Sequence, residues 1–295
     1  MKNNKQTEFS KNLHSLLNEH NKLVEANPSW KSNISDLMRC IQTDSIENFL
    51  KWDVIRKTMF VRTRPYIVKE FMFLLKNNWS QWKVLLEENK IGNPPKFFLY
   101  PKTSSNLIHH VYHVAVFFQK TGVHLNEINS ILEFGGGYGS MCRVFRKLGF
   151  EGQYYIFDLP QFSALQHYYL QSLGFRSYFN DLSVKTNKKD NYCIYDIKLL
   201  KKIGQKKDNF KTKKRLFIAT WSLSESPLSI RNDVIPLIKN YDYYLIAYQK
   251  TFDEIDNLHF FKTFVENISK VNPKIKWIHF QIPHIKDNYY LFGYK

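Results

Sequence analysis

The sequence predicts an α/β fold with a mainly parallel sheet, a helical layer in front of it and an antiparallel hairpin at its end. An apolar run at residues 130–134 leads into a loop with glycine at positions 135, 136, 137 and 139. A second apolar run ends in Asp158, and helical and strand patterns then alternate. Two closing apolar runs, residues 275–281 and 288–294, are close enough to pair antiparallel across a short loop.

The glycine-rich loop is typical of a cofactor-binding turn between a strand and a helix. Glycine lets the backbone adopt positive φ angles and approach a ligand closely. The helix expected at residues 140–148 directs its N-terminal N–H groups into the same space. We therefore predict cofactor contacts from the loop residues Gly135, Gly136, Gly137 and Tyr138.

Two acids indicate which nucleoside binds there. Asp158 lies nineteen residues beyond Gly139, at a strand end where a carboxylate accepts hydrogen bonds from both ribose hydroxyls. Glu133 lies two residues before the first glycine, where an acid repels a pyrophosphate and suits an ammonium group. The glycine spacing also differs from the dinucleotide pattern G-x-G-x-x-G. These features favour S-adenosylmethionine, which has an amino-acid tail and no phosphate.

The later elements follow in the order that an α/β sheet requires. Apolar residues at helical spacing predict a helix between Pro160 and Gly174. Further strands are predicted at residues 176–179, 216–220 and 243–248, and a helix is predicted between the last of them and Lys270.

Three residues at strand ends are additional candidates for cofactor contacts, because open α/β sheets bind ligands at the carboxyl ends of their strands. Leu159 directly follows Asp158, and Thr220 ends the fourth predicted strand. Asp181 follows the third predicted strand, where an acid suits the adenine amino group.

The chain before the sheet predicts a helical layer over residues 1–125, followed by a cofactor domain over residues 126–295. Pro65 opens a helical run with Ile67, Phe71 and Leu74 on one stripe. Such a layer can close over the cofactor and shape the acceptor pocket, or it can serve as the surface of a homodimer.

A helix expected at residues 105–120 carries three histidines. Relative to its apolar stripe, Asn106, His110 and His113 fall together on one flank, while His109 points nearly away. We predict that this flank of the helix forms a pocket wall. Asn106 would then contact the substrate, and His110 and His113 would be acid–base or substrate-binding groups. We expect no metal, since the pattern lacks the glutamate of H-E-x-x-H and no acidic cluster completes a site.

The sequence resembles a family of sugar O-methyltransferases with a class I S-adenosylmethionine domain. The motifs that carry the resemblance are I-L-E-F-G-G-G-Y-G-S at 131–140, F-D-L-P at 157–160, Q-H-Y-Y-L at 166–170, T-W-S-L-S-E-S-P at 220–227 and H-V-Y-H at 110–113. They cover roughly the last 190 residues. The resemblance implies a Rossmann-like class I methyltransferase sheet and methyl transfer from S-adenosylmethionine to a sugar hydroxyl of a glycan or nucleotide-sugar.

Methyl transfer to a hydroxyl requires alignment of the acceptor oxygen with the methyl carbon and a base that removes the proton. Glu225, beyond the fourth predicted strand, joins His110 and His113 as a candidate base. His110 is expected to face the methyl group, with Glu225 opposite. Trp221 and Ser222 are expected to contact the acceptor, with the Trp221 indole stacked on a sugar face. As a helix N-terminal acid, Glu225 also has a purely structural interpretation.

Composition and charge limit the possible locations and partners of the protein. The 295 residues include no apolar run of the ~20 residues that span a bilayer and no apolar signal core, which predicts a cytoplasmic protein. The three cysteines are expected to be reduced thiols. Of the net charge of +17, much lies in the basic run (residues 198–215), which begins at Lys198, ends at Arg215 and holds nine Lys or Arg and one acid.

The basic run has two interpretations. It is a solvated segment, or it attracts an anionic partner such as a nucleotide-sugar, an acidic surface or RNA. Its few aromatic residues argue against recognition of RNA by base stacking. The alternatives to a sugar acceptor are therefore a protein or RNA acceptor, and a non-catalytic partner that binds S-adenosylmethionine without turnover.

Overall fold

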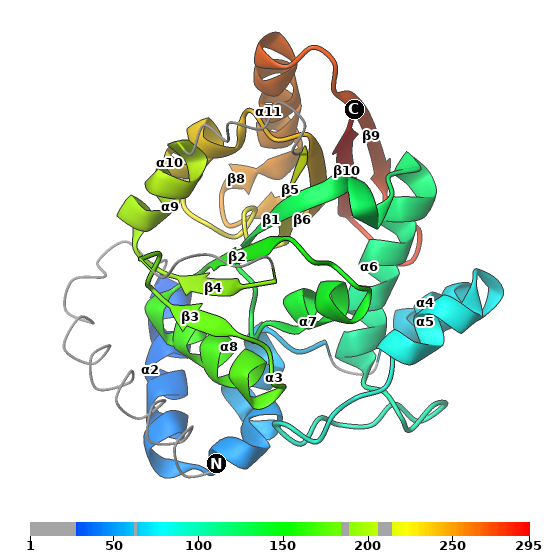
Figure 1. Cartoon of the computed structure of the whole chain (residues 1–295), viewed down its shortest axis with the longest axis vertical. Helices are drawn as coiled ribbons and strands as arrows, with labels where there is room; N and C mark the ends of the chain where they lie inside the picture. The colour runs from blue at the N-terminus through cyan, green and yellow to red at the C-terminus, as the bar shows by residue number, and fades with distance from the viewer. Residues whose placement is uncertain (1–27, 62–63, 184–188, 206–213) are drawn as a thin grey trace.

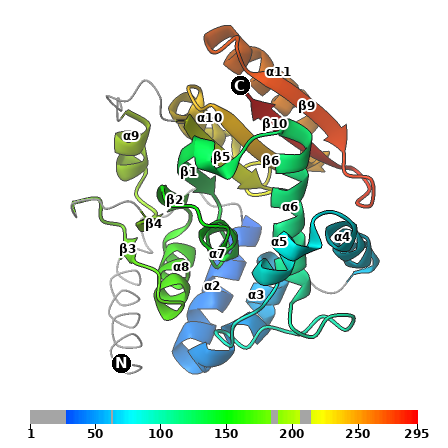
Figure 2. The same ribbon diagram turned by 45° about the vertical axis from the view of Figure 1, so that its right-hand side comes forward.

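The computed structural model describes residues 28–61, 64–183, 189–205 and 214–295. One eight-stranded sheet lies between two layers of helices (Figures 1 and 2). The strand order is β3-β4-β2-β1-β5-β6-β10-β9. The strands are β1 (Ile128–Phe134), β2 (Gln153–Phe157), β3 (Ser177–Phe179), β4 (Asn191–Ile194), β5 (Lys214–Thr220), β6 (Tyr243–Gln249), β9 (Lys276–Gln281) and β10 (Asn288–Tyr294), with a separate pair β7 (Thr251–Phe252) and β8 (Ile255–Asp256).

The sheet is parallel from β3 to β6, and β10 is antiparallel to both β6 and β9. The predicted hairpin therefore forms: Leu291 lies opposite His279 in β9 and opposite Ile246 in β6. The predicted fold class, a mainly parallel sheet with a C-terminal antiparallel hairpin, is confirmed.

One strand was missed by the sequence analysis. β4 pairs with β2 and pushes β3 to the edge of the sheet. Its sequence, N-Y-C-I, is only four residues long and has no apolar alternation that marks it as a strand. As a consequence, Asp181 follows an edge strand, whereas Asp196 follows the strand next to β2.

Successive residues of each strand face opposite layers of helices, as strand geometry requires. In β1, Ile131 packs into one hydrophobic cluster and Leu132 into the other. The first layer contains α2 (Pro28–Thr43), α3 (Asp53–Thr58), α4 (Pro65–Lys76), α5 (Trp79–Leu85), α6 (Ser105–Thr121), α7 (Ser140–Lys147) and α8 (Pro160–Ser172). The second contains α9 (Ile197–Gln205), α10 (Leu228–Ile238) and α11 (Asn257–Val271).

The helices that precede β1 share their core with the sheet. A single hydrophobic cluster joins Leu37 and Phe49 of the helical layer with Ile131 and Phe292 of the sheet. Three cysteines, at positions 40, 142 and 193, are buried and free, as expected for packing residues. Within the described ranges, none of the helices has the length and apolar character needed to cross a membrane.

Candidate functional site

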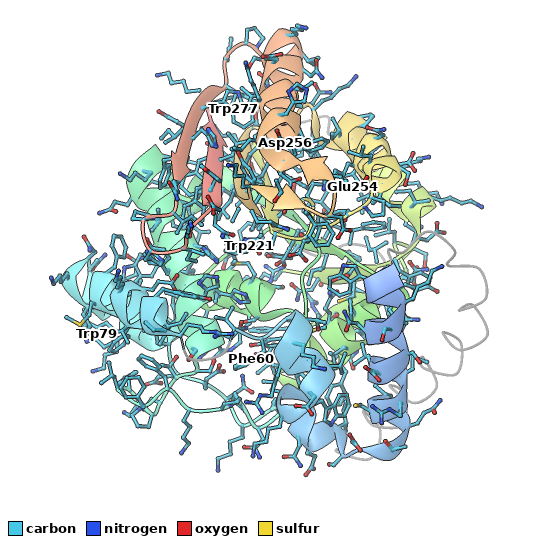
Figure 3. All side chains as sticks on the ribbon, turned by 180° about the vertical axis from the view of Figure 1, so that it is seen from behind. Phe60, Trp79, Trp221, Glu254, Asp256 and Trp277 are labelled. Atoms are coloured by element: carbon cyan, nitrogen blue, oxygen red, sulfur yellow. The ribbon has the colours of Figure 1, made fainter. Side chains whose placement is uncertain are left out.

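A cleft of about 1440 Å³ lies where the carboxyl ends of β1, β2, β4 and β5 meet α2, α3 and α6. Its walls come from both the sheet and the helical layer, with Trp221 on the sheet side and Phe60 on the helical side (Figure 3). Pockets for a single small ligand usually measure roughly 300–1,000 Å³. The cleft is therefore large enough for a cofactor and an acceptor together.

The glycine-rich loop forms the floor of the cleft, and its backbone requires glycine. Gly135 has a φ of 73° and Gly137 a φ of 57°, in the left-handed region. A Cβ atom on Gly135 would lie 2.2 Å from Cβ of Ser222, which is too close for any other residue type. The Ser222 hydroxyl donates to the Phe134 carbonyl, so this predicted substrate contact also holds the loop after β5 against the glycine-rich loop.

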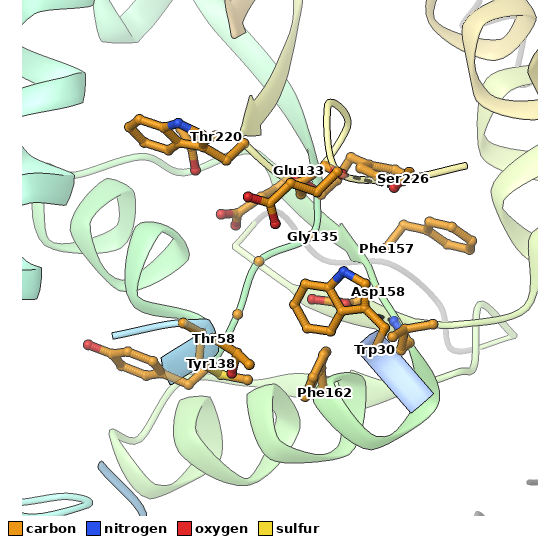
Figure 4. A pocket seen from close by; sticks show the side chains of 18 of the residues that line it. Trp30, Thr58, Glu133, Gly135, Tyr138, Phe157, Asp158, Phe162, Thr220 and Ser226 are labelled. Atoms are coloured by element: carbon orange, nitrogen blue, oxygen red, sulfur yellow. Dashed lines mark hydrogen bonds between the residues drawn. The ribbon is translucent and has the colours of Figure 1, made fainter. Parts of the chain in front are cut away.

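Two carboxyl groups, the buried Glu133 and the half-buried Asp158, flank the loop near Gly135 (Figure 4). Glu133 accepts a hydrogen bond from the Tyr154 hydroxyl at 2.8 Å, and burial raises its pKa to about 8. Asp158 accepts from the Leu159 N–H and from Nε2 of Gln166, both at 2.8 Å, and burial raises its pKa to about 7. No Lys or Arg among the described residues pairs with either acid, so a ligand that carries positive charge fits here.

The raised pKa of Glu133 predicts how stability depends on pH. The unfolded state ionises near pH 4.5, whereas the folded carboxyl keeps its proton to about pH 8. Between these values the folded state binds more protons, so stability is lost as pH rises, by at most about 1.4 kcal/mol per pH unit for one group. Urea unfolding from pH 5 to 8 should show a steeper decline in the wild type than in Glu133→Gln. Parallel pH profiles would contradict the burial of a neutral Glu133.

The residues that line the cleft beside Asp158 are not all those expected from the sequence. Asp181 is not among the residues that line the cleft, and its carboxylate accepts from the N–H of Ser183 in its own loop. The cleft is lined instead by Asp196, after β4, together with Leu159 and Trp30 of α2. The Trp30 ring lies 5.7 Å from that of Phe162, centroid to centroid. Trp30 could not be assigned from the sequence, because its place over the cleft depends on how α2 packs on α8.

The histidine wall comes from α6. Asn106 lines the cleft, but its side chain is occupied: Nδ2 donates to the Tyr138 hydroxyl at 3.0 Å, and Oδ1 accepts from the Val61 N–H at 2.9 Å. This arrangement ties the helical layer to the glycine-rich loop. All three histidines line the cleft, including His109, which was expected to point away from the apolar stripe and was not a candidate site residue.

His110 and His113 are both held neutral by their surroundings. Burial, with a smaller contribution from His109, lowers the pKa of His110 to about 3. Burial also lowers the pKa of His113 well below its usual range. Nδ1 of His113 is hydrogen-bonded to the Tyr290 hydroxyl, and its Nε2 is buried without a partner in the described part of the chain.

The loop after β5 supplies the opposite wall. Thr220, Trp221 and Glu225 all line the cleft, and burial raises the pKa of Glu225 to about 7. Trp221 has a φ of 65°, which is rare for a bulky residue and marks local strain. Its Nε1 donates to Oδ1 of Asn288 at 2.6 Å, and its ring stacks on His109 with centroids 5.4 Å apart.

The basic run is only partly described. Lys198 lines the cleft, whereas Lys214 pairs with Glu127 at 2.5 Å and the Arg215 guanidinium lies 4.6 Å from the centre of the Tyr241 ring. The contacts of Lys214 and Arg215 therefore stabilise β5, to which both residues belong. Residues 206–213 of the run lie outside the described residues. No group of three His, Cys, Asp or Glu in the described ranges is arranged to hold a metal ion.

Similar solved structures include a methyltransferase, a fibrillarin and a methyltransferase-like protein. Magnesium protoporphyrin IX methyltransferase from Synechocystis PCC 6803 with bound SAH is 10% identical, with a TM-score of 0.41 over 77% of this chain and 98% of that one. Fibrillarin pre-rRNA processing protein from Methanococcus jannaschii is 14% identical, with a TM-score of 0.40 over 61% and 73%. Human methyltransferase-like protein 13 in complex with SAH is 14% identical, with a TM-score of 0.38 over 63% and 81%.

No protein-family model and no curated protein matches the chain. The fold assignment therefore depends on the sheet itself, in which six parallel strands are followed by the antiparallel β9–β10 hairpin. This is the class I S-adenosylmethionine-dependent methyltransferase fold. Two of the similar structures hold SAH.

Proposed function

We propose that this chain is an S-adenosylmethionine-dependent O-methyltransferase that acts on a sugar hydroxyl of a glycan or nucleotide-sugar. The observation that carries the proposal is the composition of the cleft. One part has the glycine-rich loop with two acids, Glu133 and Asp158, and the other has histidines and Trp221. Such an arrangement can hold a cationic cofactor next to a hydroxyl acceptor and proton-accepting groups.

The residues in the first part fit S-adenosylmethionine. Asp158 would accept the ribose hydroxyls, Glu133 the ammonium group, and the Gly135–Gly137 backbone would lie against the methionine tail. Both acids need a cation or donors to offset the cost of ionisation, since burial has raised their pKa values. When bound, this cofactor supplies an electrophilic methyl group on a sulfonium. The protein supplies orientation, exclusion of water and removal of the acceptor proton.

Basic side chains that line the cleft favour an acceptor with negative charge. Arg56, Lys57 and Arg64 line it, and none of them has an ion pair within the described residues. Lysine and arginine that are free of acidic partners attract phosphate or carboxylate. Trp221 and Tyr66 offer aromatic faces for sugar rings. Together these features support a nucleotide-sugar or an acidic sugar over a neutral one.

Two experiments test the proposal. Calorimetry should show binding of S-adenosylmethionine and SAH, with no comparable binding of NADH. Transfer of tritium from methyl-labelled S-adenosylmethionine is then measured to UDP-glucose, glucuronate and methyl glucoside, with total RNA and a peptide pool as competing acceptors. We expect label in the charged sugars. Label in RNA or peptide would overturn the sugar assignment, and tight cofactor binding with no transfer to any acceptor would support a non-catalytic role.

A further inference from the structure

A buried carboxylate lies behind the histidine wall. Glu70 of α4 is completely buried, and both of its oxygens lie 2.9 Å from Nδ1 of His109 in α6. Its Oε1 also lies 2.9 Å from Nε2 of His284, in the loop between β9 and β10. Three segments that are far apart in the sequence thus meet at one carboxylate.

This carboxylate is held in its ionised form. Burial by itself would raise the pKa of Glu70, but the imidazoles of His109 and His284 outweigh it and hold that pKa below its usual range. Burial of an ionised carboxylate costs several kcal/mol unless partners compensate for the lost water. Since an ionised carboxylate can only accept hydrogen bonds, Nδ1 of His109 donates to it. In the neutral form of His109, the lone pair is then on Nε2.

The surroundings of His109 fix the orientation of its ring. The ring stacks on Trp221, lies 5.8 Å from the Tyr66 ring and lies 4.1 Å from the His113 ring, measured between centroids. Nε2 of His109 makes no hydrogen bond within the described part of the chain, and the residue lines the cleft. Nε2 is therefore the basic atom that this wall offers to a ligand.

The other candidate bases are less suitable. His113 has Nδ1 bonded to Tyr290, and Nε2 is buried. His110 has a buried Nδ1 without a partner in the described residues, and no carboxylate orients its ring. Glu225 has no hydrogen bond to position its carboxyl group within those residues, although it reaches the cleft.

We propose that His109 is the general base of the acceptor site, with Glu70 as the positioning residue that fixes its tautomer and His284 as a second support for Glu70. This inference depends on the proposed function, and it replaces His110 in the role expected from the sequence. The acceptor hydroxyl passes its proton to Nε2 of His109. Its oxygen forms a bond to the methyl carbon as the carbon–sulfur bond breaks, and that electron pair stays on sulfur. The imidazolium then releases the proton to solvent.

Kinetics provide the first test, with UDP-glucose and glucuronate as acceptors. His109→Gln should lower kcat roughly 10²–10⁴-fold, while the calorimetric Kd for S-adenosylmethionine stays within about twofold. Glu70→Gln should lower kcat roughly tenfold to a hundredfold with little change in KM. Added imidazole should restore part of the activity of His109→Gly, which a purely structural role would not allow. His259→Gln, on the exposed face of α11, is the matched control with unchanged kinetics.

Nuclear magnetic resonance tests the same idea without an acceptor. In protein labelled with ¹⁵N-histidine, the His109 ring is assigned by its loss in His109→Gln. We expect the Nδ1–H tautomer in the wild type and its loss or exchange broadening in Glu70→Gln. An Nε2–H tautomer in the wild type overturns the proposal, because Nε2 then has no lone pair.

The two proposals fail in different ways. If S-adenosylmethionine does not bind, the proposed function is wrong. If it binds and His109→Gln transfers methyl groups as fast as the wild type, only the role of His109 is wrong. Thermal unfolding of each variant establishes that it is folded before either conclusion is drawn.

Discussion

Asp158→Ala is expected to weaken S-adenosylmethionine binding by roughly 10²–10⁴-fold. The carboxylate is placed at the end of β2, next to the glycine-rich loop, where it can accept both ribose hydroxyls. Each hydrogen bond to a charged group contributes about 1.5–3 kcal/mol, so the loss of two accounts for this range. Titration calorimetry of the wild type and the variant measures the change directly.

Asp181→Ala is the matched control, because this acid is equally close to a strand end in sequence but does not line the cleft. Its affinity should equal that of the wild type. Asp196→Ala, at the end of β4, should show an intermediate loss if the adenine lies on that side. An Asp158→Ala variant that retains wild-type affinity would remove the basis for the cofactor assignment.

Arg231→Met is expected to destabilise the fold by about 3 kcal/mol or more. The guanidinium of Arg231 is fully buried and donates to the carbonyls of Ser224 and Ser226 and, at 2.7 Å, to Oδ1 of Asn257. Burial lowers its pKa to about 10. Methionine matches its length but makes none of these three hydrogen bonds, and only the Ser224 carbonyl keeps another donor, Nδ2 of Asn257 at 3.4 Å. Each acceptor left unsatisfied in a buried position costs about 1–3 kcal/mol. Urea unfolding at constant pH measures the difference.

Arg39→Met is the comparison for Arg231→Met, since the Arg39 side chain is 71% exposed and its one ion pair is on the surface. We expect it to change stability by less than about 1 kcal/mol. If Arg231→Met unfolds at the wild-type urea concentration, the loop that carries Glu225 is held by other contacts. Reduced methyl transfer in a folded Arg231→Met protein would link the geometry of this loop to catalysis.

The parts of the site that are local in sequence could be predicted. The glycine-rich loop, Glu133 and Asp158 all belong to two consecutive strand–turn–helix segments, so their spacing alone brings them together. β4 was missed because four residues are too few to show a period. Its absence from the predicted sheet also placed Asp181, and not Asp196, after the strand next to β2.

The histidine wall could not be resolved from the sequence. α6 is buried on almost every side, including Ile108, Tyr112 and Val116 outside its apolar stripe, so the stripe does not define one core-facing side. His109 therefore enters the cleft although it was expected to point away from that stripe. A signal for Glu70 was present, since it falls on the same helical stripe as Ile67, Phe71 and Leu74, where an acid is out of place. Its two histidine partners depend on tertiary packing.

The shared hydrophobic core of the helices and the sheet has a consequence for how this enzyme could change its acceptor. A detachable cap can be exchanged between relatives as a unit, but here Leu37 and Phe49 belong to the same core as Ile131 and Phe292. Exchanging residues 1–125 would disturb the support of the sheet along with the acceptor wall. New specificity is therefore more accessible through single substitutions on the cleft surface, such as Arg56 or Tyr66, than through recombination of modules.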